Sequence, residues 1–222
     1  MLPRPLQAML LPPLTDLVAL LGIALVLCAI GLRLLNARHR GAGWAKWGLA
    51  AFFVVLWLPV GAAHLPVVAY ARGITSDLSI TLVALACIGL CQHLFGTPAI
   101  SRREKTALNA VVAVVALILY PLALGWSDWD AYRAGWGSFG MLGSLLALSL
   151  GFWTRGLRLL PVVIGLALLA WSAGLMESTN LWDYLVDPWL AMAALVQSVK
   201  AGVQNWRHRI RQDALSIRSS PP

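Results

Sequence analysis

Acidic and aromatic side chains are concentrated in residues 177–188, ESTNLWDYLVDP. The segment holds three of the nine acidic residues of the chain and two aromatic residues, namely Glu177, Asp183, Asp187, Trp182 and Tyr184. Two carboxylates whose pKa values diverge can act as general acid and general base. Aromatic rings beside hydrogen-bonding groups can bind a sugar or a cationic head group. The segment is therefore a candidate catalytic or ligand-binding site.

Two other polar segments have a similar composition, YARGITSD at 70–77 and WSDWDAYRAGW at 126–136. All three connect neighbouring predicted helices on one side of the molecule, so we expect them to converge. Asp130, Glu177 and Asp183 are the candidates for a catalytic acid or base. The candidate ligand-binding residues are Arg72, Asp77, Trp126, Asp128, Trp129, Asp130, Tyr132, Arg133, Glu177, Asn180, Trp182, Asp183, Tyr184 and Asp187.

The same residues also fit structural roles. Asp187 before Pro188 is a good N-cap followed by proline at the first helical position. Asn180 with Asp183 three residues on is typical of a capping box, and Asp77 could cap the next helix. Tryptophan and tyrosine at helix ends commonly form an interfacial belt. A belt does not require carboxylates at every second or third position, so the binding hypothesis stays open.

The overall composition of the chain predicts the helices that position these residues. The chain has 222 residues, of which 59% are hydrophobic and 12% charged, and its mean hydropathy is +0.76. A soluble domain carries about 25% charged residues. Because so little charge cannot cover a water-exposed surface, the sequence predicts an all-α, polytopic integral membrane bundle. Each crossing needs about 20 apolar residues, so the length allows six or seven helices.

Seven apolar runs predict about seven transmembrane helices within a single domain, 1–206, followed by a short basic cytoplasmic tail, 207–222. The last run is the weakest, because Pro188 to Lys200 covers only about 18 Å of a core about 30 Å thick. A lysine can extend its stem towards the interface, and the alternative is a helix lying flat on the outer face. The predicted spans are 17–35, 47–63, 78–95, 107–124, 139–153, 157–175 and 188–206.

Charge sidedness predicts the orientation. With seven crossings, one side holds 14 of the 17 basic residues and two acidic residues, for a charge of +12, and the other side carries −4. Cytoplasmic loops are the ones enriched in Lys and Arg, so the amino terminus is expected outside and the carboxyl terminus in the cytoplasm. The net charge of +8 then reflects orientation and contact with anionic membrane lipid, and no nucleic-acid partner is expected.

Several chemistries lack their usual residues. No Asp, Glu or Arg falls near the centre of a predicted span, which disfavours ion-coupled transport. Motifs for nucleotide binding, zinc hydrolysis and serine nucleophiles are missing, and neither a metal nor a cofactor is expected. The cysteines fall in apolar runs and are interpreted as packing residues. Pro59 and Pro121 are expected to bend the second and fourth helices, and His64 and His93 to lie at helix ends.

These observations favour a bacterial inner-membrane accessory or assembly protein. Its periplasmic loops would bind a protein partner or a glycolipid, in envelope lipid or polysaccharide handling. The alternative is a membrane enzyme acting at the outer leaflet on a lipid-linked sugar or a phospholipid head group. In that case Arg72 or Arg133 would hold a phosphate. A facilitative channel is a third hypothesis, but it needs a polar path that the sequence scarcely supplies.

Overall fold

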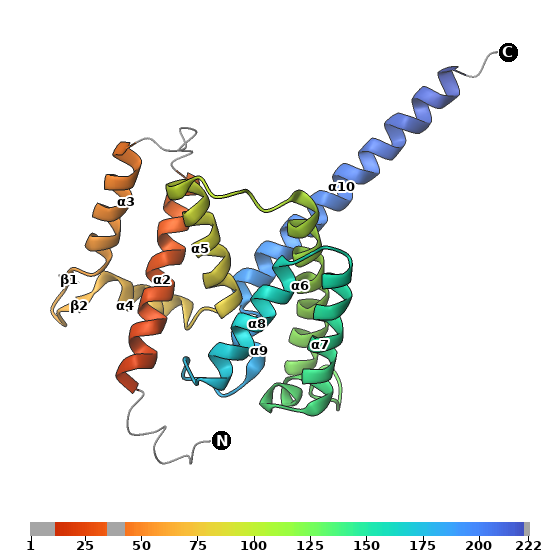
Figure 1. Cartoon of the computed structure of the whole chain (residues 1–222). Coiled ribbons are helices and arrows are strands. Elements are labelled where there is room, and N and C mark those ends of the chain that lie inside the picture. Colours follow the sequence, from red (N-terminus) through yellow and green to blue (C-terminus); the bar gives the residue numbers. More distant parts are fainter. Residues whose placement is uncertain (1–11, 35–42, 220–222) are drawn as a thin grey trace.

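The computed structural model describes residues 12–34 and 43–219, and this part of the chain is all-α apart from one short β-hairpin. The predicted helical class is confirmed. Figure 1 shows successive long helices that run in alternating directions between two ends of a bundle.

The first half of the chain forms one group of helices. The hairpin follows α3, and α4 lies across the bundle before α5 turns back alongside α2 (Figure 1). Ser79 starts α5 by accepting a hydrogen bond from the Leu82 amide, as a serine N-cap does. The elements are α2 (Pro12–Leu34), α3 (Gly43–Leu56), β1 (Pro59–Val60), β2 (Leu65–Pro66), α4 (Val67–Thr75) and α5 (Ile80–Phe95).

The second half adds four long helices and two short ones. The short helices η1 and α9 lie together at the end of the bundle opposite the carboxyl end of α10 (Figure 1). The elements are α6 (Arg102–Ala123), η1 (Ala131–Trp136), α7 (Phe139–Thr154), α8 (Leu159–Ser172), α9 (Leu181–Leu185) and α10 (Pro188–Ser219).

The second apolar run is not one continuous helix. Helix α3 ends at Leu56, and Pro59 lies in β1, so the predicted bend at Pro59 is wrong. Proline disfavours helical backbone in the residue before it and supplies no amide hydrogen. His64 lies in the hairpin with φ of 51°, not at a helix end. Pro121 does lie inside a helix, in the last turn of α6.

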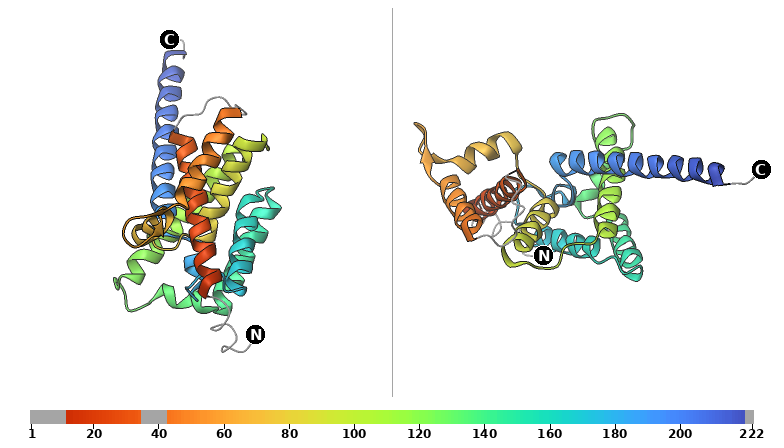
Figure 2. Two further views of the ribbon diagram at one scale, coloured as in Figure 1. Left: turned by 90° about the vertical axis from the view of Figure 1, so that its left-hand side faces the viewer. Right: turned by 90° about the horizontal axis from the view of Figure 1, so that it is seen from above.

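The last helix is longer than the sequence pattern predicts. Helix α10 continues to Ser219, through most of the segment predicted as a short tail. Beyond Gly202 the chain has no glycine or proline before Pro221, so no residue type stops the helix. At 32 residues, it is about 48 Å long. Figures 1 and 2 show it projecting beyond the other helices.

Two hydrophobic clusters hold the helices together. The first lies among α2 to α5 and includes Ile23 and Val68. The second joins α6 to α10 and contains Leu181 and Tyr184, both 0% exposed. Helix α5 contacts both halves, because it packs on α2 and on α8. The molecule is therefore two packed groups of helices that meet along α5.

Large apolar side chains also cover the outer faces of the helices. Leu117 of α6 is 62% exposed and Leu169 of α8 is 68% exposed. Two helical stretches, Leu14–Leu34 and Arg102–Ala123, are long and apolar enough to cross a membrane. Four shorter apolar stretches, of 10 to 17 residues, lie in α3, α5, α7 and α8.

Candidate functional site at the acidic end of the bundle

Arg72 is the centre of a cluster of carboxylates, the Arg72 cluster. Its Nε donates to Asp77 Oδ1 at 2.7 Å, Nη1 to Asp16 Oδ1 at 2.5 Å, and Nη2 to Glu177 Oε1 at 2.8 Å. The hydrogen bond to Asp77, followed by those to Asp16 and Glu177, raises the pKa of the Arg72 guanidinium above its ordinary value, although burial lowers it. Arg72 therefore stays charged and ties three chain segments together.

The local backbone explains how Arg72 and Asp77 meet. Arg72 lies in the last turn of α4, and the Ser76 amide donates to the Arg72 carbonyl at 2.8 Å. Ser76 has a φ of 60°, in the left-handed region, which turns the chain sharply after the helix. Asp77 then lies beside the guanidinium, and it does not cap α5. The predicted cap at Asp77 is wrong, because Ser79 takes that position.

Asp183 joins the segments 126–136 and 177–188. Tyr132 Oη donates to Asp183 Oδ2 at 2.7 Å, and Ser178 Oγ donates to the same oxygen. Burial first, and then the hydrogen bond to Asp183, raise the pKa of Tyr132 above its ordinary value. Two more bonds run between these segments, from Asn180 Nδ2 to the Tyr132 carbonyl at 3.0 Å and from Trp182 Nε1 to the Ala131 carbonyl at 3.1 Å.

Gly135 permits this close approach. A Cβ atom at Gly135 would lie 1.8 Å from Asn180 Oδ1 and 2.7 Å from Trp182 Cδ1. Any side chain at this position would displace the α9 segment, so the contact between η1 and α9 requires glycine. Asn180 Oδ1 also accepts from the Trp182 amide at 3.0 Å and so caps α9. Because Asp183 binds Tyr132 and Ser178, the predicted capping box is only half correct.

Asp187 links the starts of two long helices. Its Oδ1 accepts from the Leu190 amide at 2.8 Å, which confirms the predicted cap of α10. Its Oδ2 accepts from the Ser79 amide at 2.9 Å and from Ser79 Oγ at 2.6 Å. Asp187 is 4% exposed and Ser79 is 0% exposed. A buried carboxylate with three donors is fully committed to holding α5 and α10 together.

Tyr184 also has a structural position. Its ring is 0% exposed, its Oη donates to the Ser178 carbonyl at 3.0 Å, and it accepts from the Met176 amide at 3.2 Å. Burial raises the pKa of this phenol. The side chain therefore has no free face for a ligand.

A different group of predicted residues stays open to solvent. Trp126, Trp129 and Trp136 are 80%, 65% and 58% exposed, and Asp128 and Arg133 beside them are exposed as well. Within the described ranges, the side chains of Asp128 and Arg133 make no hydrogen bond or ion pair. The aromatic surface, as we term it, consists of Trp126, Asp128, Trp129, Arg133 and Trp136.

Each of the predicted acid and base candidates accepts at least one hydrogen bond from within the protein. Glu177 binds Arg72, Asp183 binds Tyr132 and Ser178, and Asp130 Oδ1 accepts from the Tyr132 amide at 2.9 Å. These contacts form a hydrogen-bonded frame that connects the three polar segments. In the described ranges, no three His, Cys, Asp or Glu side chains are grouped so that they could hold a metal ion.

Sequence reasoning missed three members of this frame, Asp16, Ser79 and Ser178. A serine in front of an apolar stretch, as Ser79 is in front of Ile80, is a signal for a helix start, whereas Asp16 lies inside α2. The partners of Asp16 and Ser79 are Arg72 and Asp187, which are 56 and 108 residues away in the sequence, so no local signal shows either pairing.

Comparison with known proteins gives no relative. No protein-family model matches this chain, and neither a curated protein nor a solved structure is similar to it. Within the described ranges, the fold and the site define it as a helical bundle with two candidate membrane spans.

Proposed function

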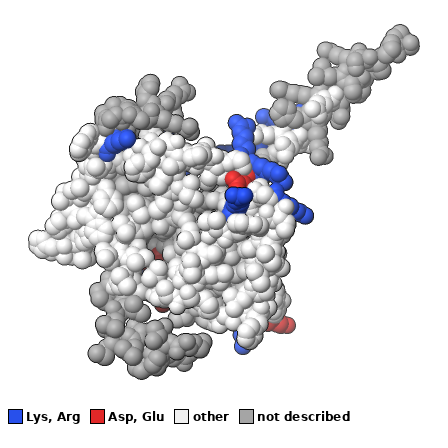
Figure 3. All heavy atoms as spheres, viewed as in Figure 1, with Lys and Arg blue, Asp and Glu red and all other residues white. Residues whose placement is uncertain are grey.

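We propose that the chain is a multipass inner-membrane protein whose seven long helices cross the bilayer. The observation that supports this best is the lack of charge on the sides of the bundle. Helices α5, α7 and α8 contain no Asp, Glu, Lys or Arg. In Figure 3, Lys and Arg cluster at one end, and most of the surface below them is uncharged. Extended apolar surface of this kind favours a lipid environment.

The shorter helices fit this proposal with a modest mismatch. Helices α3 and α8 have 14 residues each, or about 21 Å, against a core about 30 Å thick. A short span is accommodated by local thinning of the bilayer and by flanking residues that reach the interface. Trp153 and Trp171, near the ends of α7 and α8, are suited to that position.

The proposed orientation follows the distribution of charge. The end of the bundle with Arg102, Lys105 and Arg155 lies in the cytoplasm, and the end with the Arg72 cluster lies in the periplasm. Helix α10 then crosses the membrane and continues into the cytoplasm as a helix.

We propose a binding role at the periplasmic end, as an accessory or assembly protein in envelope lipid or polysaccharide handling. The carboxylates needed for acid–base chemistry are already hydrogen-bonded within the protein, so no observation favours the enzyme alternative. The aromatic surface combines exposed indole rings with a carboxylate and a guanidinium. That combination suits a glycolipid sugar or a partner protein at the membrane surface.

The test compares exposed tryptophans at the two ends. The double variant Trp126→Ala and Trp129→Ala removes two of the three indole rings of the aromatic surface. Trp47→Ala is the matched control, since Trp47 is 78% exposed near the other end. We expect the wild-type protein and the control to migrate with a bound partner on native electrophoresis, and the double variant to migrate without it.

The enzyme alternative has its own readout. Asp130→Asn, Glu177→Gln and Asp183→Asn are expressed singly, and envelope glycolipids are quantified together with complex formation. Loss of a lipid product with the complex intact and the protein folded would contradict the binding role.

A further inference from the structure

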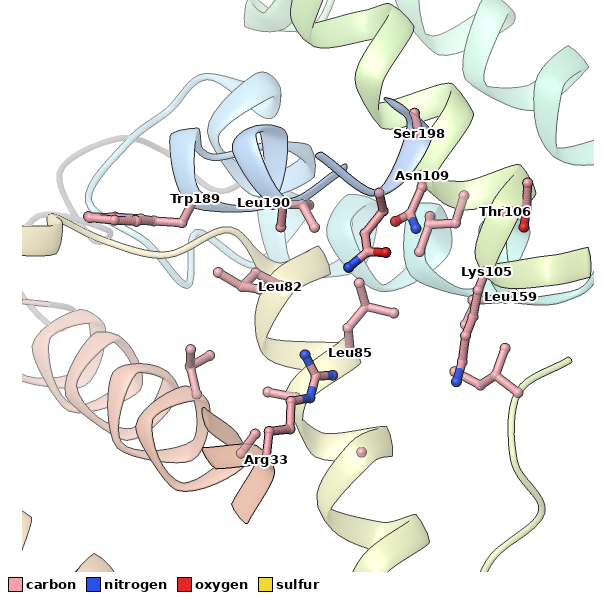
Figure 4. Close-up of a pocket in the computed structure, with 18 of the residues that line it drawn as sticks. Arg33, Leu82, Leu85, Lys105, Thr106, Asn109, Leu159, Trp189, Leu190 and Ser198 are labelled. Carbon is pink, nitrogen blue, oxygen red and sulfur yellow. The ribbon is translucent and has the colours of Figure 1, made fainter. Parts of the chain in front are cut away.

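A large cavity lies between α2, α5, α6 and α10, and it runs from the acidic end, at Thr75 and Trp189, towards the opposite end of the bundle. Its volume is about 1030 Å³, at the upper end of the range for ligand pockets. Helix α10 packs along α6, whereas α2 packs on α5, and the cavity lies between these two pairs. Figure 4 shows Leu82 and Leu85 of α5 facing Trp189 and Leu190 of α10 across it. Most of the lining is apolar.

One end of the cavity is cationic. Its lining includes Arg33, Arg102, Lys105 and Lys200, which come from α2, α6 and α10. In the described part of the chain, every ion pair uses Arg72, so these four cations have no carboxylate partner. In Figure 4, the guanidinium of Arg33 extends towards the cavity beside Leu85. Gly89 lies beside it, since a Cβ there would be 4.0 Å from Arg33 Nη2, an ordinary van der Waals distance.

Uncharged polar groups lie near these cations. Asn109 of α6 and Gln197 and Ser198 of α10 line the cavity, and Figure 4 shows the Asn109 amide on its inner side. Ser198 Oγ is buried and has no hydrogen-bond partner among the described residues. A buried hydroxyl without a partner is uncommon in proteins. Because that oxygen is buried among protein atoms, it lies behind the cavity wall, and the polar groups within reach of a ligand are the amides of Asn109 and Gln197.

The cavity is elongated, and its polarity changes along its length. Its lining on α10 runs from Trp189 to Asn205, a distance of about 24 Å. The apolar lining lies beside Trp189, and the cations lie towards Lys200 and Asn205. A small hydrophilic anion would leave the apolar part unused, and a neutral lipid would leave the cations unpaired. An anionic amphiphile fits both parts.

We propose that this cavity binds an anionic glycerophospholipid from the leaflet on the cationic side. The phosphodiester lies among Arg33, Arg102, Lys105 and Lys200, and acyl chains lie against Leu82, Leu85 and Leu190. Basic pockets between membrane helices on the cytoplasmic side bind anionic lipid in this way. The inference requires that the helices lie in lipid, but it does not involve the aromatic surface.

The test uses the full chain reconstituted in nanodiscs that contain equal amounts of phosphatidylglycerol and phosphatidylcholine with the same acyl chains. After extraction in mild detergent, the retained lipid is quantified by mass spectrometry. We expect phosphatidylglycerol to be enriched. Arg102→Gln and Lys105→Gln should each reduce that enrichment by roughly fivefold.

Arg103→Gln is the matched control, because Arg103 is exposed one residue away and does not line the cavity. It should leave the enrichment unchanged. Ala193→Phe tests the apolar part, since Ala193 lines the cavity on α10, and it should reduce retention of both lipids. Melting temperatures of all variants verify that they are folded.

Equal retention of the two lipids, or the same loss in Arg103→Gln as in Lys105→Gln, would overturn the proposal. Displacement of the lipid by glycerol phosphate at equal concentration would also overturn it, because the apolar contacts would then contribute nothing. Dimers cross-linked through a cysteine placed at Ala193 would assign the cavity to a second copy of the chain. Lipid retention does not depend on which side of the membrane is cytoplasmic. The lipid-binding experiment can therefore be interpreted even if the proposed orientation is wrong.

Discussion

The acidic and cationic ends of this protein use their charges in different ways. At the acidic end, Asp16, Asp77 and Glu177 share Arg72, and Asp187 accepts three hydrogen bonds in the interior. At the cationic end, Arg33, Arg102, Lys105 and Lys200 line a cavity and have no carboxylate partner within the described ranges. Paired charges hold segments together, whereas unpaired charges beside a cavity are available for a ligand.

The comparison changes the interpretation of the polar segments. A dense set of carboxylates and aromatic residues in a membrane protein is commonly taken as a functional site. Here most of the carboxylates bind other parts of the chain, and the charged part of the cavity lies at the opposite end of the bundle. Charge removal should therefore lower stability at the acidic end, and should lower lipid binding but not stability at the cationic end.

The largest expected effect is at Asp187. Asp187→Ala leaves the Ser79 amide, Ser79 Oγ and the Leu190 amide without an acceptor, so the free energy of unfolding should fall by about 3 kcal/mol. Asp128→Ala is the control, because Asp128 is exposed, and it should change stability by less than about 0.5 kcal/mol. Denaturant unfolding in detergent, followed by tryptophan fluorescence, measures both. Equal effects of the two variants would remove the structural role of Asp187.

A smaller loss is expected at Gly135. Gly135→Ala places a methyl group against Asn180 and Trp182, and overpacking of this kind costs about 2 kcal/mol. Gly140→Ala is the matched change in α7, where a Cβ meets nothing within 4 Å, and it should cause no loss. If Gly135→Ala melts at the wild-type temperature, η1 and α9 are not in the close contact described above.

Arg72→Gln should lower stability less than Gly135→Ala does, and the loss of stability should depend on pH. Without the guanidinium, three carboxylates are left close together at neutral pH, so the melting temperature should fall by a few degrees. Acid should reduce this difference, because protonated carboxyl groups no longer repel one another. Lys105→Gln, at the cationic end, should melt like the wild-type protein. The comparison between the two ends fails if Lys105→Gln is the less stable variant.

The smallest effect concerns Tyr132 in alkaline solution. Burial and Asp183 raise the pKa of Tyr132 in the folded protein, so an unfolded tyrosine loses its proton at lower pH than the folded one. Stability should therefore decline as the pH rises above about 10. Tyr132→Phe should decline less steeply over that range, as measured by denaturant unfolding at a series of pH values. Identical slopes would place Tyr132 in a solvated environment.

Local sequence signals predicted much of the fold. Apolar runs located the long helices, and Asp187 before Pro188 predicted the start of α10. The prediction was wrong near Pro59, where a hydropathy pattern continues although the backbone cannot remain helical. It also ended α10 at Trp206, because hydropathy falls there while helix propensity does not.

The site was less predictable, because the residues that bind each other in it are distant in the sequence. Glu177 and Arg72 are 105 residues apart, and Ser79 and Asp187 are 108 apart. A single sequence gives the type of each residue but not which distant side chain it meets. The cavity is harder still to predict, since its cations lie on three helices and each of them is also accounted for by the proposed orientation in a membrane.

The most direct test of the proposed membrane position is the accessibility of single cysteines in intact cells. Cys28, Cys87 and Cys91 are replaced by alanine, and one cysteine is introduced at Asp128 or at Arg155. A membrane-impermeant maleimide should label the cysteine at position 128 in intact cells, and the one at position 155 only after permeabilisation. Labelling of position 155 alone, or of both positions, in intact cells would contradict the proposed arrangement.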